Sequence, residues 1–263
     1  MKREIVLSGL IMMCADIFAL DGYQIVKQMK EIPEPENSSV NAVLTIHSKK
    51  GNERVRQILM KTKDFGEVKK EVIVFKTPKD VEGVGYLMFD YPEDASGNKK
   101  DSDNWLYMPA MKKTRRIAAS GTDSESQFMG TDFTYEDIGE RALSKDDYKL
   151  LGEETVNGVL CYKVECVSKS GKEKDSRRIV YCGKEDFLLR KCEFFDRQNA
   201  LHRVLTASDV QTIKGYKVTL VMKMENVQTE TWSKIEMKDV VYDNASIDDN
   251  IFTVASLERE NIR

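Results

Sequence analysis

The feature that most constrains this chain is an alternation of apolar and polar side chains that recurs from residue 40 to residue 242. In the clearest segment, Val218, Leu220 and Met222 alternate with Lys217 and Thr219. A two-residue period is typical of strands with one face buried. No long helical pattern separates the segments, as a doubly wound α/β fold would require. The chain is therefore expected to be mainly β and antiparallel.

About eleven segments are expected to be strands: 40–46, 54–63, 69–76, 83–91, 104–109, 157–167, 177–183, 187–196, 200–207, 215–224 and 229–242. At this short spacing they indicate a sheet that curls or closes. A helix is expected over residues 21–32, where Asp21 can cap the start and Pro33 ends it. Residues 93–103 and 118–127 are polar and are expected to be solvated loops. We find no internal repeat or interdomain linker, so residues 21–263 are expected to form one domain.

The N-terminus is expected to be a signal segment over residues 1–20. A basic start precedes the apolar run 5–13, which is typical of a secretory signal and too short to span a bilayer. Two processing routes remain open: cleavage before Cys14, which would then carry lipid, or an ordinary cut near Ala19. Both routes predict export to the periplasm, with a membrane anchor in the first case.

Composition excludes several classes of protein. With 32% charged residues the chain is not a multi-span membrane protein, and a net charge of −3 gives no bulk attraction to nucleic acid. The two histidines, His47 and His202, both lie within strand-like alternation and are weak candidates for a catalytic base. We find no nucleophile elbow, phosphate loop or CxxC pair, so no cofactor and no metal site are expected.

Four cysteines follow the signal segment. Cys161 and Cys182 lie on segments that could form a hairpin about residues 168–176, which would place them roughly opposite each other. Because disulfides are permitted after export, this pair is a candidate disulfide. The alternative is that these two, together with Cys166 and Cys192, are four small buried thiols.

Two segments and a basic run between them are distinctive. The segments are 105–109 (Trp-Leu-Tyr-Met-Pro) and 128–138, which holds four large apolar side chains in eight residues; the run 112–116 contains four basic residues. The basic run is either a solvated strand edge or a contact for anionic head groups or an acidic partner. With 12 methionines, the apolar supply fits either an ordinary core or a sheet lined to hold a lipid chain.

The order of motifs resembles the outer-membrane lipoprotein-sorting protein family, which is similar to the LolA/LolB lipoprotein carriers. It comprises Thr77-Pro-Lys-Asp80-Val-Glu-Gly83, the segment 105–109, Arg115-Arg-Ile117 and the segment 128–137. The resemblance implies a single-domain open antiparallel half-barrel of about eleven strands, with a few helices covering an apolar cavity that receives acyl chains. The expected lipid-binding residues at its rim or lid are Trp105, Tyr107, Arg115, Arg116, Phe128, Met129, Phe133 and Tyr135. Asp132 and Asp137 are expected to fix the turn by hydrogen bonds to backbone amides.

The expected function is therefore that of a non-enzymatic periplasmic protein that binds lipids or lipoproteins. It would hold acyl chains of lipoproteins or phospholipids and take part in sorting or transferring lipoproteins to the outer membrane, with inner- or outer-membrane sorting partners. One alternative is a lipid hydrolase that uses the same cavity and requires His47 or His202. Another is an envelope scaffold that binds a protein partner through residues 105–116 and binds no lipid.

Overall fold

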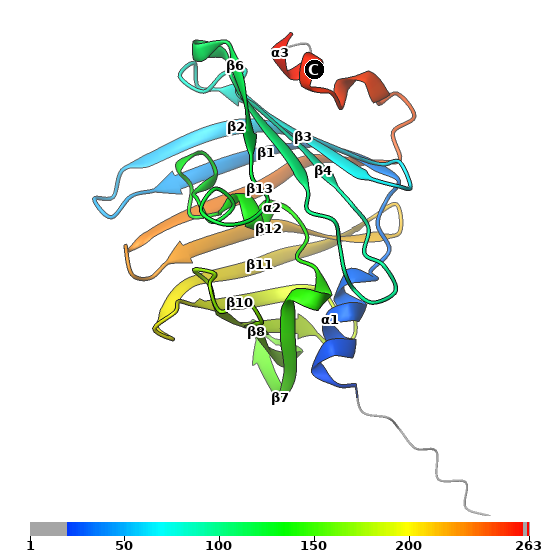
Figure 1. The fold of residues 1–263 in the computed structure, drawn as a ribbon, viewed down its shortest axis with the longest axis vertical. Coiled ribbons are helices and arrows are strands. Elements are labelled where there is room, and N and C mark those ends of the chain that lie inside the picture. The colour runs from blue at the N-terminus through cyan, green and yellow to red at the C-terminus, as the bar shows by residue number, and fades with distance from the viewer. Residues whose placement is uncertain (1–19, 260–261, 263) are drawn as a thin grey trace, which may run out of the picture.

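The computed structural model describes residues 20–259 and residue 262, so Cys14 and nearly all of the expected signal segment lie outside the described residues. Within this part of the chain, thirteen antiparallel strands form one open sheet (Figure 1). The strands are β1 (Asn37–His47), β2 (Glu53–Asp64), β3 (Lys69–Thr77), β4 (Gly85–Asp90), β5 (Asp103–Met108), β6 (Lys113–Ile117), β7 (Asp146–Val156), β8 (Val159–Ser168), β9 (Arg177–Gly183), β10 (Leu189–Phe195), β11 (Leu201–Ile213), β12 (Tyr216–Asn226) and β13 (Thr231–Tyr242). The α-helices are α1 (Gly22–Lys30), α2 (Tyr135–Ile138) and α3 (Val254–Glu258), and the 3-10 turns are η1 (Pro109–Met111), η2 (Phe128–Gly130), η3 (Leu143–Lys145) and η4 (Asp249–Ile251).

The first and last strands pair in the middle of the sheet. The strand order is β6-β5-β4-β3-β2-β1-β13-β12-β11-β10-β9-β8-β7. The chain therefore runs outward from β1 to one edge, crosses over through residues 118–145, and returns from the other edge to β13. We name residues 118–145 the crossing segment. This arrangement confirms the expected mainly β, open half-barrel.

The sheet has two more strands than the eleven expected from sequence, and both are edge strands. They are β6, with the sequence Lys-Thr-Arg-Arg-Ile, and β7, which begins Asp-Asp-Tyr-Lys. A charged, poorly alternating sequence is a common feature of edge strands, because it discourages pairing with other chains. The same feature weakens the alternation by which strands are recognised in a sequence.

Helix α1 confirms the expected N-terminal helix. The Asp21 carboxylate accepts a hydrogen bond from the Gln24 amide at 2.8 Å, and the Gln24 side chain accepts one from the Asp21 amide at 3.0 Å. This reciprocal pair satisfies two backbone donors at the helix start. Ile25 is fully buried against Val164 and neighbouring residues of β8, so the apolar side of α1 faces the sheet.

The inner face of the sheet is the face that carries Leu44, Ile73 and Tyr86. Over β1–β6 the crossing segment covers this face, and its Phe128 and Tyr135 rings lie 5.4 and 5.6 Å from the Tyr86 ring. Aromatic pairs at such distances add to the stabilisation from buried area. This half of the inner face is therefore a packed core.

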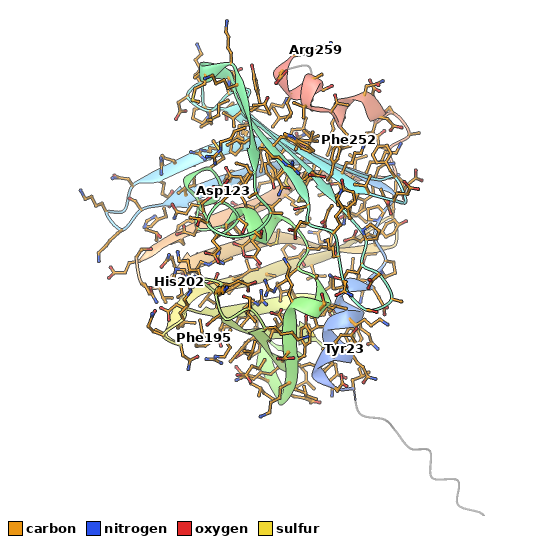
Figure 2. All side chains as sticks on the ribbon, viewed as in Figure 1. Tyr23, Asp123, Phe195, His202, Phe252 and Arg259 are labelled. Carbon is orange, nitrogen blue, oxygen red and sulfur yellow. The ribbon has the colours of Figure 1, made fainter. Side chains whose placement is uncertain are left out.

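The outer face of β3–β5 is covered by the C-terminal segment. Phe252 is fully buried and, with Leu257, packs against Val72, Leu87 and Tyr107. Helix α3 contacts β4, β5 and β6 and lies at the same end of the molecule as β6 in Figure 1, and Figure 2 labels Phe252 in the same C-terminal segment. The space left open is therefore on the inner face, over the strands of the second half of the chain and the adjoining ends of β1–β3.

Candidate functional site

A cavity of about 740 Å³ lies on the inner face, bounded by α1, part of the crossing segment, strands β8–β12 and the ends of β1–β3 that carry Ser38, Thr62 and Glu71. This volume falls within the range of roughly 300–1,000 Å³ that is usual for small-molecule sites. Its apolar wall includes Val26 and Met29 of α1 together with Val180, Phe194, Leu205 and Met222 of four neighbouring strands. The wall can receive an apolar chain, because binding removes both the surface of the chain and the apolar surface of the wall from water.

Helix α1 lies very close to the edge of the sheet and so fixes one wall of the cavity. A Cβ atom on Gly22 would lie 2.9 Å from the backbone nitrogens of Lys149 and Leu150 in β7. Real Cβ atoms do not approach backbone so closely, so a residue without a side chain is required here. The close approach, together with buried Ile25, directs Val26 and Met29 toward the cavity.

Two cysteines, Cys166 and Cys192, also line the cavity. Burial raises the pKa of the Cys166 thiol to about 12, and it raises the pKa of the Cys192 thiol as well. Both are therefore neutral at physiological pH and act as small apolar wall residues rather than as nucleophiles.

The structure does not contain the disulfide that the sequence allows between Cys161 and Cys182. All four described cysteines are free and buried. Cys182 lies opposite Tyr162 across the β8–β9 pair, whereas Cys161 lies opposite Gly183. Because directly opposed residues share a face and neighbours along a strand do not, the two sulfur atoms are on opposite faces of the sheet. Their Cβ vectors diverge, which a disulfide cannot accommodate without backbone movement.

One end of the cavity is charged, and Arg203 is its most buried cation. Its Nη1 donates to the Asp132 carbonyl at 3.0 Å and to Asp137 at 2.5 Å, while its Nη2 donates to Asp175 at 2.5 Å. The guanidinium also lies 4.6 Å from the centre of the Phe194 ring. Burial works against the charged form, but the two carboxylates outweigh it and raise the pKa of Arg203.

A second arginine, Arg141, ties the crossing segment to β7. It donates to Asp146 at 2.8 Å and to Glu136 and Glu173 at 2.7 Å each. Arg178 of β9 forms an ion pair with the same Asp146. Burial opposes the charge of Arg141, yet the hydrogen bond and charge of Asp146 prevail and raise its pKa. These pairs hold the crossing segment across the cavity's charged end.

Two lysines on the side of the cavity near α1 and β3 are also paired. Lys30 forms ion pairs with Glu93 and, at 3.8 Å, with Glu140. Lys69 forms ion pairs with Glu34 and, at 3.5 Å, with Glu140. Neither lysine offers a free charge to the cavity.

Glu71 of β3 lines the same cavity and differs from these residues. The described residues contain no hydrogen bond or ion pair within 4 Å to its carboxylate. Burial raises the pKa of Glu71 to about 7; the charge of Lys69 opposes this, and the charges of Asp90 and Glu34 add to it. Its carboxyl group is therefore partly protonated at neutral pH.

The structure places the aromatic residues of the crossing segment in the core. Phe128 and Tyr135 pack under Tyr86, and Tyr135 also borders a small polar cavity of about 40 Å³. The Met129 carbonyl accepts a hydrogen bond from Arg56 at 2.7 Å. Phe133 is buried beside the wall residue Phe194. None of the four crossing-segment residues lines the 740 Å³ cavity.

Of the two acidic residues expected to bond to backbone amides of this segment, Asp137 does so and Asp132 does not. The Asp137 carboxylate accepts a hydrogen bond from the Thr134 amide at 2.7 Å, as expected. Asp132 instead accepts from the hydroxyl groups of Ser233 at 2.7 Å and Thr231 at 2.5 Å, both on β13. Asp132 therefore fastens the segment to the sheet.

The other predicted site residues lie on β5 and β6, away from the cavity. Trp105 and Tyr107 face outward and pack against the C-terminal segment. Arg116 is exposed and forms an ion pair with Asp103, and Arg115 is exposed on the edge strand. The structure thus separates the eight predicted residues between two faces of the sheet, and their role in lipid binding stays a prediction.

Both histidines have structural partners. The His47 ring stacks on Trp232 with their centres 4.9 Å apart. His202, labelled in Figure 2, is buried, with its Nδ1 at 2.9 Å from Asp175 and its Nε2 at 3.4 Å from Asn226. The contacts of His47 with Trp232 and of His202 with Asn226 therefore join neighbouring strands of the sheet.

The comparisons with known proteins give the family. A family model described as "Uncharacterized protein" matches residues 67–259. The chain belongs to this family. A comparison with curated proteins found no match.

Three solved structures are similar over 90% of this chain. They are a DUF1329 family protein from Desulfovibrio piger (29% identity, 97% of that chain, TM-score 0.81), a putative outer membrane lipoprotein-sorting protein domain from Vibrio parahaemolyticus (25%, 98%, 0.80) and a LolA superfamily protein from Nitrosomonas europaea (18%, 100%, 0.67). These similarities confirm the resemblance to lipoprotein-sorting and LolA-like proteins, and the third concerns the fold alone.

The residues predicted from the sequence to bind lipid do not include the residues that line the cavity. Cys192, Leu205 and Met222 lie on strands that were expected, and their alternation already placed them on one face. Charge pairing such as that of Arg203 leaves no signal in one sequence. Among residues 20–259 and 262, no cluster of metal-ligating side chains and no helix able to span a membrane is found.

Proposed function

We propose that this protein binds lipids or lipoproteins without catalysis in the periplasm of a bacterial cell. It holds acyl chains in the inner-face cavity and takes part in sorting or transferring lipoproteins to the outer membrane. The observation that carries the proposal is the 740 Å³ cavity with its apolar wall over β8–β12. The lipoprotein-sorting name of a structure with a TM-score of 0.80 supports it, as does the signal-like start of the sequence.

In the proposed mechanism, an acyl chain moves between a membrane and the cavity, which are similarly apolar. Each CH₂ group that leaves water contributes about 0.8 kcal/mol, whether it enters a membrane or an apolar cavity. Moving a chain from a membrane into the cavity therefore changes the free energy little. Such a protein can accept and release a chain without a chemical energy source, and its partners decide the direction of transfer.

Phe133 is the predicted rim residue that we retain in this proposal. It comes from the crossing segment and packs beside Phe194, which forms part of the cavity wall. A shift of the crossing segment would move Phe133 together with that wall. The other seven predicted residues have no such contact with the wall and stay predictions.

Filling the cavity tests the proposal. Val180 lines the cavity from β9, and a Val180→Trp variant should reduce the affinity for a fluorescent fatty acid at least tenfold. Val241 of β13 is 45% exposed and does not line the cavity, so Val241→Trp is the matched control and should bind as the wild type does. Circular dichroism of both variants checks folding. Equal affinity in a folded Val180→Trp variant would exclude this cavity.

A second measurement addresses the scaffold alternative. Native mass spectrometry of protein purified from membranes should show a retained acyl ligand. An empty cavity together with a bound protein would favour a scaffold instead. The same spectrum reports whether the mature chain begins at a lipidated Cys14, which the two processing routes leave open.

A further inference from the structure

The charged side chains that line the cavity are almost all in ion pairs, most of them with one another. Six basic and seven acidic residues line it among the described residues. All six basic side chains have a carboxylate within 4.0 Å: Lys30, Lys69, Arg141, Arg178, Arg203 and Lys217. Of the seven acidic side chains, Glu71 alone has no ion pair within that distance in the described part of the chain. The cavity therefore holds one carboxylate in excess.

Lys69, the cation that acts on Glu71, and Lys99, which pairs with the nearby Asp90, are both held by other residues. Lys69 lies two residues away on the same strand, but its ammonium group contacts Glu34 and Glu140. Asp90 of β4 pairs with Lys99 at 2.7 Å. Bringing one of these lysines to Glu71 would break an existing ion pair, so a new cation is the simplest partner.

Two hydroxyl groups share the face and the level of Glu71. Ser38 of β1 lies opposite Thr62 of β2, and Thr62 lies opposite Glu71 of β3. All three side chains line the cavity. The described residues contain no hydrogen bond to either hydroxyl group. A row of three oxygen acceptors therefore borders the same cavity as the apolar wall over β9–β12.

This row fits the chemistry of an amine. A primary ammonium group carries three N–H donors and one positive charge. A carboxylate and two hydroxyl oxygens can accept those three bonds, and the positive charge matches the excess carboxylate. An anionic head group at this row would face the charge of Glu71, while Lys69 on the same strand is already held by Glu34 and Glu140.

Building on the proposed lipid-binding function, we propose that the ligand is an amphiphile with a primary ammonium group. Glu71 binds the ammonium group as an ion pair, Ser38 and Thr62 accept its remaining hydrogen bonds, and the hydrocarbon chain lies along the apolar wall over β8–β12. The site therefore selects a ligand with a positively charged head group over ligands with an anionic or neutral head group.

Three probes with the same chain test this: dodecylamine and dodecyl sulfate, each below its micelle concentration, and dodecanol below its solubility limit. Binding is measured by calorimetry at pH 8.5, where Glu71 is ionised and the amine is still charged. Dodecylamine should bind the wild type at least tenfold more tightly than dodecanol, and dodecyl sulfate more weakly. Glu71→Gln should reduce the affinity for dodecylamine at least tenfold and leave that for dodecanol unchanged.

Glu67→Gln is the matched control, because Glu67 is exposed in the turn before β3 and does not line the cavity. It should retain the preference for the amine. If the wild type binds dodecylamine and dodecanol equally, or if Glu71→Gln keeps the preference, the inference is wrong while the proposed function stands. If none of the probes binds, dodecanol included, the proposed function itself fails. Binding of dodecanol by Glu71→Gln also shows that the variant is folded.

Discussion

Glu71 should make the stability of the ligand-free protein depend on pH. Burial raises its pKa to about 7, against 4.5 for an ordinary glutamate. The folded state therefore holds the proton more tightly than the unfolded state does. The free energy of unfolding that Glu71 takes from the protein is small below about pH 4.5. This loss grows as the pH rises from 4.5 to about 7 and is constant above pH 7. Replacing Glu71 with Gln removes this cost.

The magnitude follows from the two pKa values. At 1.36 kcal/mol per pKa unit, a change from 4.5 to about 7 corresponds to about 3 kcal/mol for the ionised carboxylate. Because Glu71 faces an open cavity, water lowers this cost. The difference in unfolding free energy between Glu71→Gln and the wild type should therefore increase by about 2 kcal/mol from pH 5 to pH 8, in favour of the variant.

Urea denaturation at pH 5, 6, 7 and 8, followed by tryptophan fluorescence, measures this difference. Trp105 and Trp232 lie on β5 and β13 and report on both halves of the sheet. Glu67→Gln should follow the wild type at every pH, because Glu67 is exposed. A difference between Glu71→Gln and the wild type that stays constant from pH 5 to pH 8 would refute the reasoning.

Three further variants test other parts of the structure. Arg203→Ala leaves Asp137 and Asp175 without their cation and should cost about 3–5 kcal/mol in urea denaturation, so a cost below 1 kcal/mol would contradict the buried network. Gly22→Ala forces α1 away from β7; we expect a loss of about 1–3 kcal/mol and weaker fatty-acid binding, and unchanged thermal unfolding would argue against the close approach. Phe252→Ala should cost about 3–5 kcal/mol but leave fatty-acid affinity unaltered in the folded protein, because Phe252 packs on the outer face; a lower affinity would link the two faces.

Most of the fold could be predicted from alternation, and the failures have a physical cause. A strand in the middle of the sheet, such as β12, must bury one side chain in two and so carries the pattern. The edge strands β6 and β7 bury fewer side chains and carry charges that prevent pairing with other chains. The sequences of β6 and β7 are therefore determined more by the need to avoid pairing with other chains than by burial of one face. For this reason alternation does not reveal them.

For the site, the sequence could predict which face of the sheet a residue lies on, but not whether that residue lines the cavity or packs in the core. Phe128 and Cys192 are both apolar residues on the inner side of the structure, yet Phe128 fills the core and Cys192 lines the cavity. What separates them is the path of the crossing segment, which covers most of the inner face of β1–β6 and leaves the inner face open over β8–β12 and the ends of β1–β3. That path depends on contacts such as Asp132 with Ser233, about 100 residues apart, and no local pattern encodes them.

The pairing of β1 with β13 has a consequence for how the chain folds. Ser38 lies opposite Tyr242, about 200 residues later, while every other strand pair joins neighbours along the chain. Each half can form as a series of hairpins, but joining the halves closes a loop that spans nearly the whole described chain, and such contacts slow folding. If the chain emerges N-terminus first from an export channel, the free edge of β1 stays open until Thr231–Tyr242 has followed. With that order of emergence, the unpaired edge of β1 is available for pairing with other chains until the last strand is out.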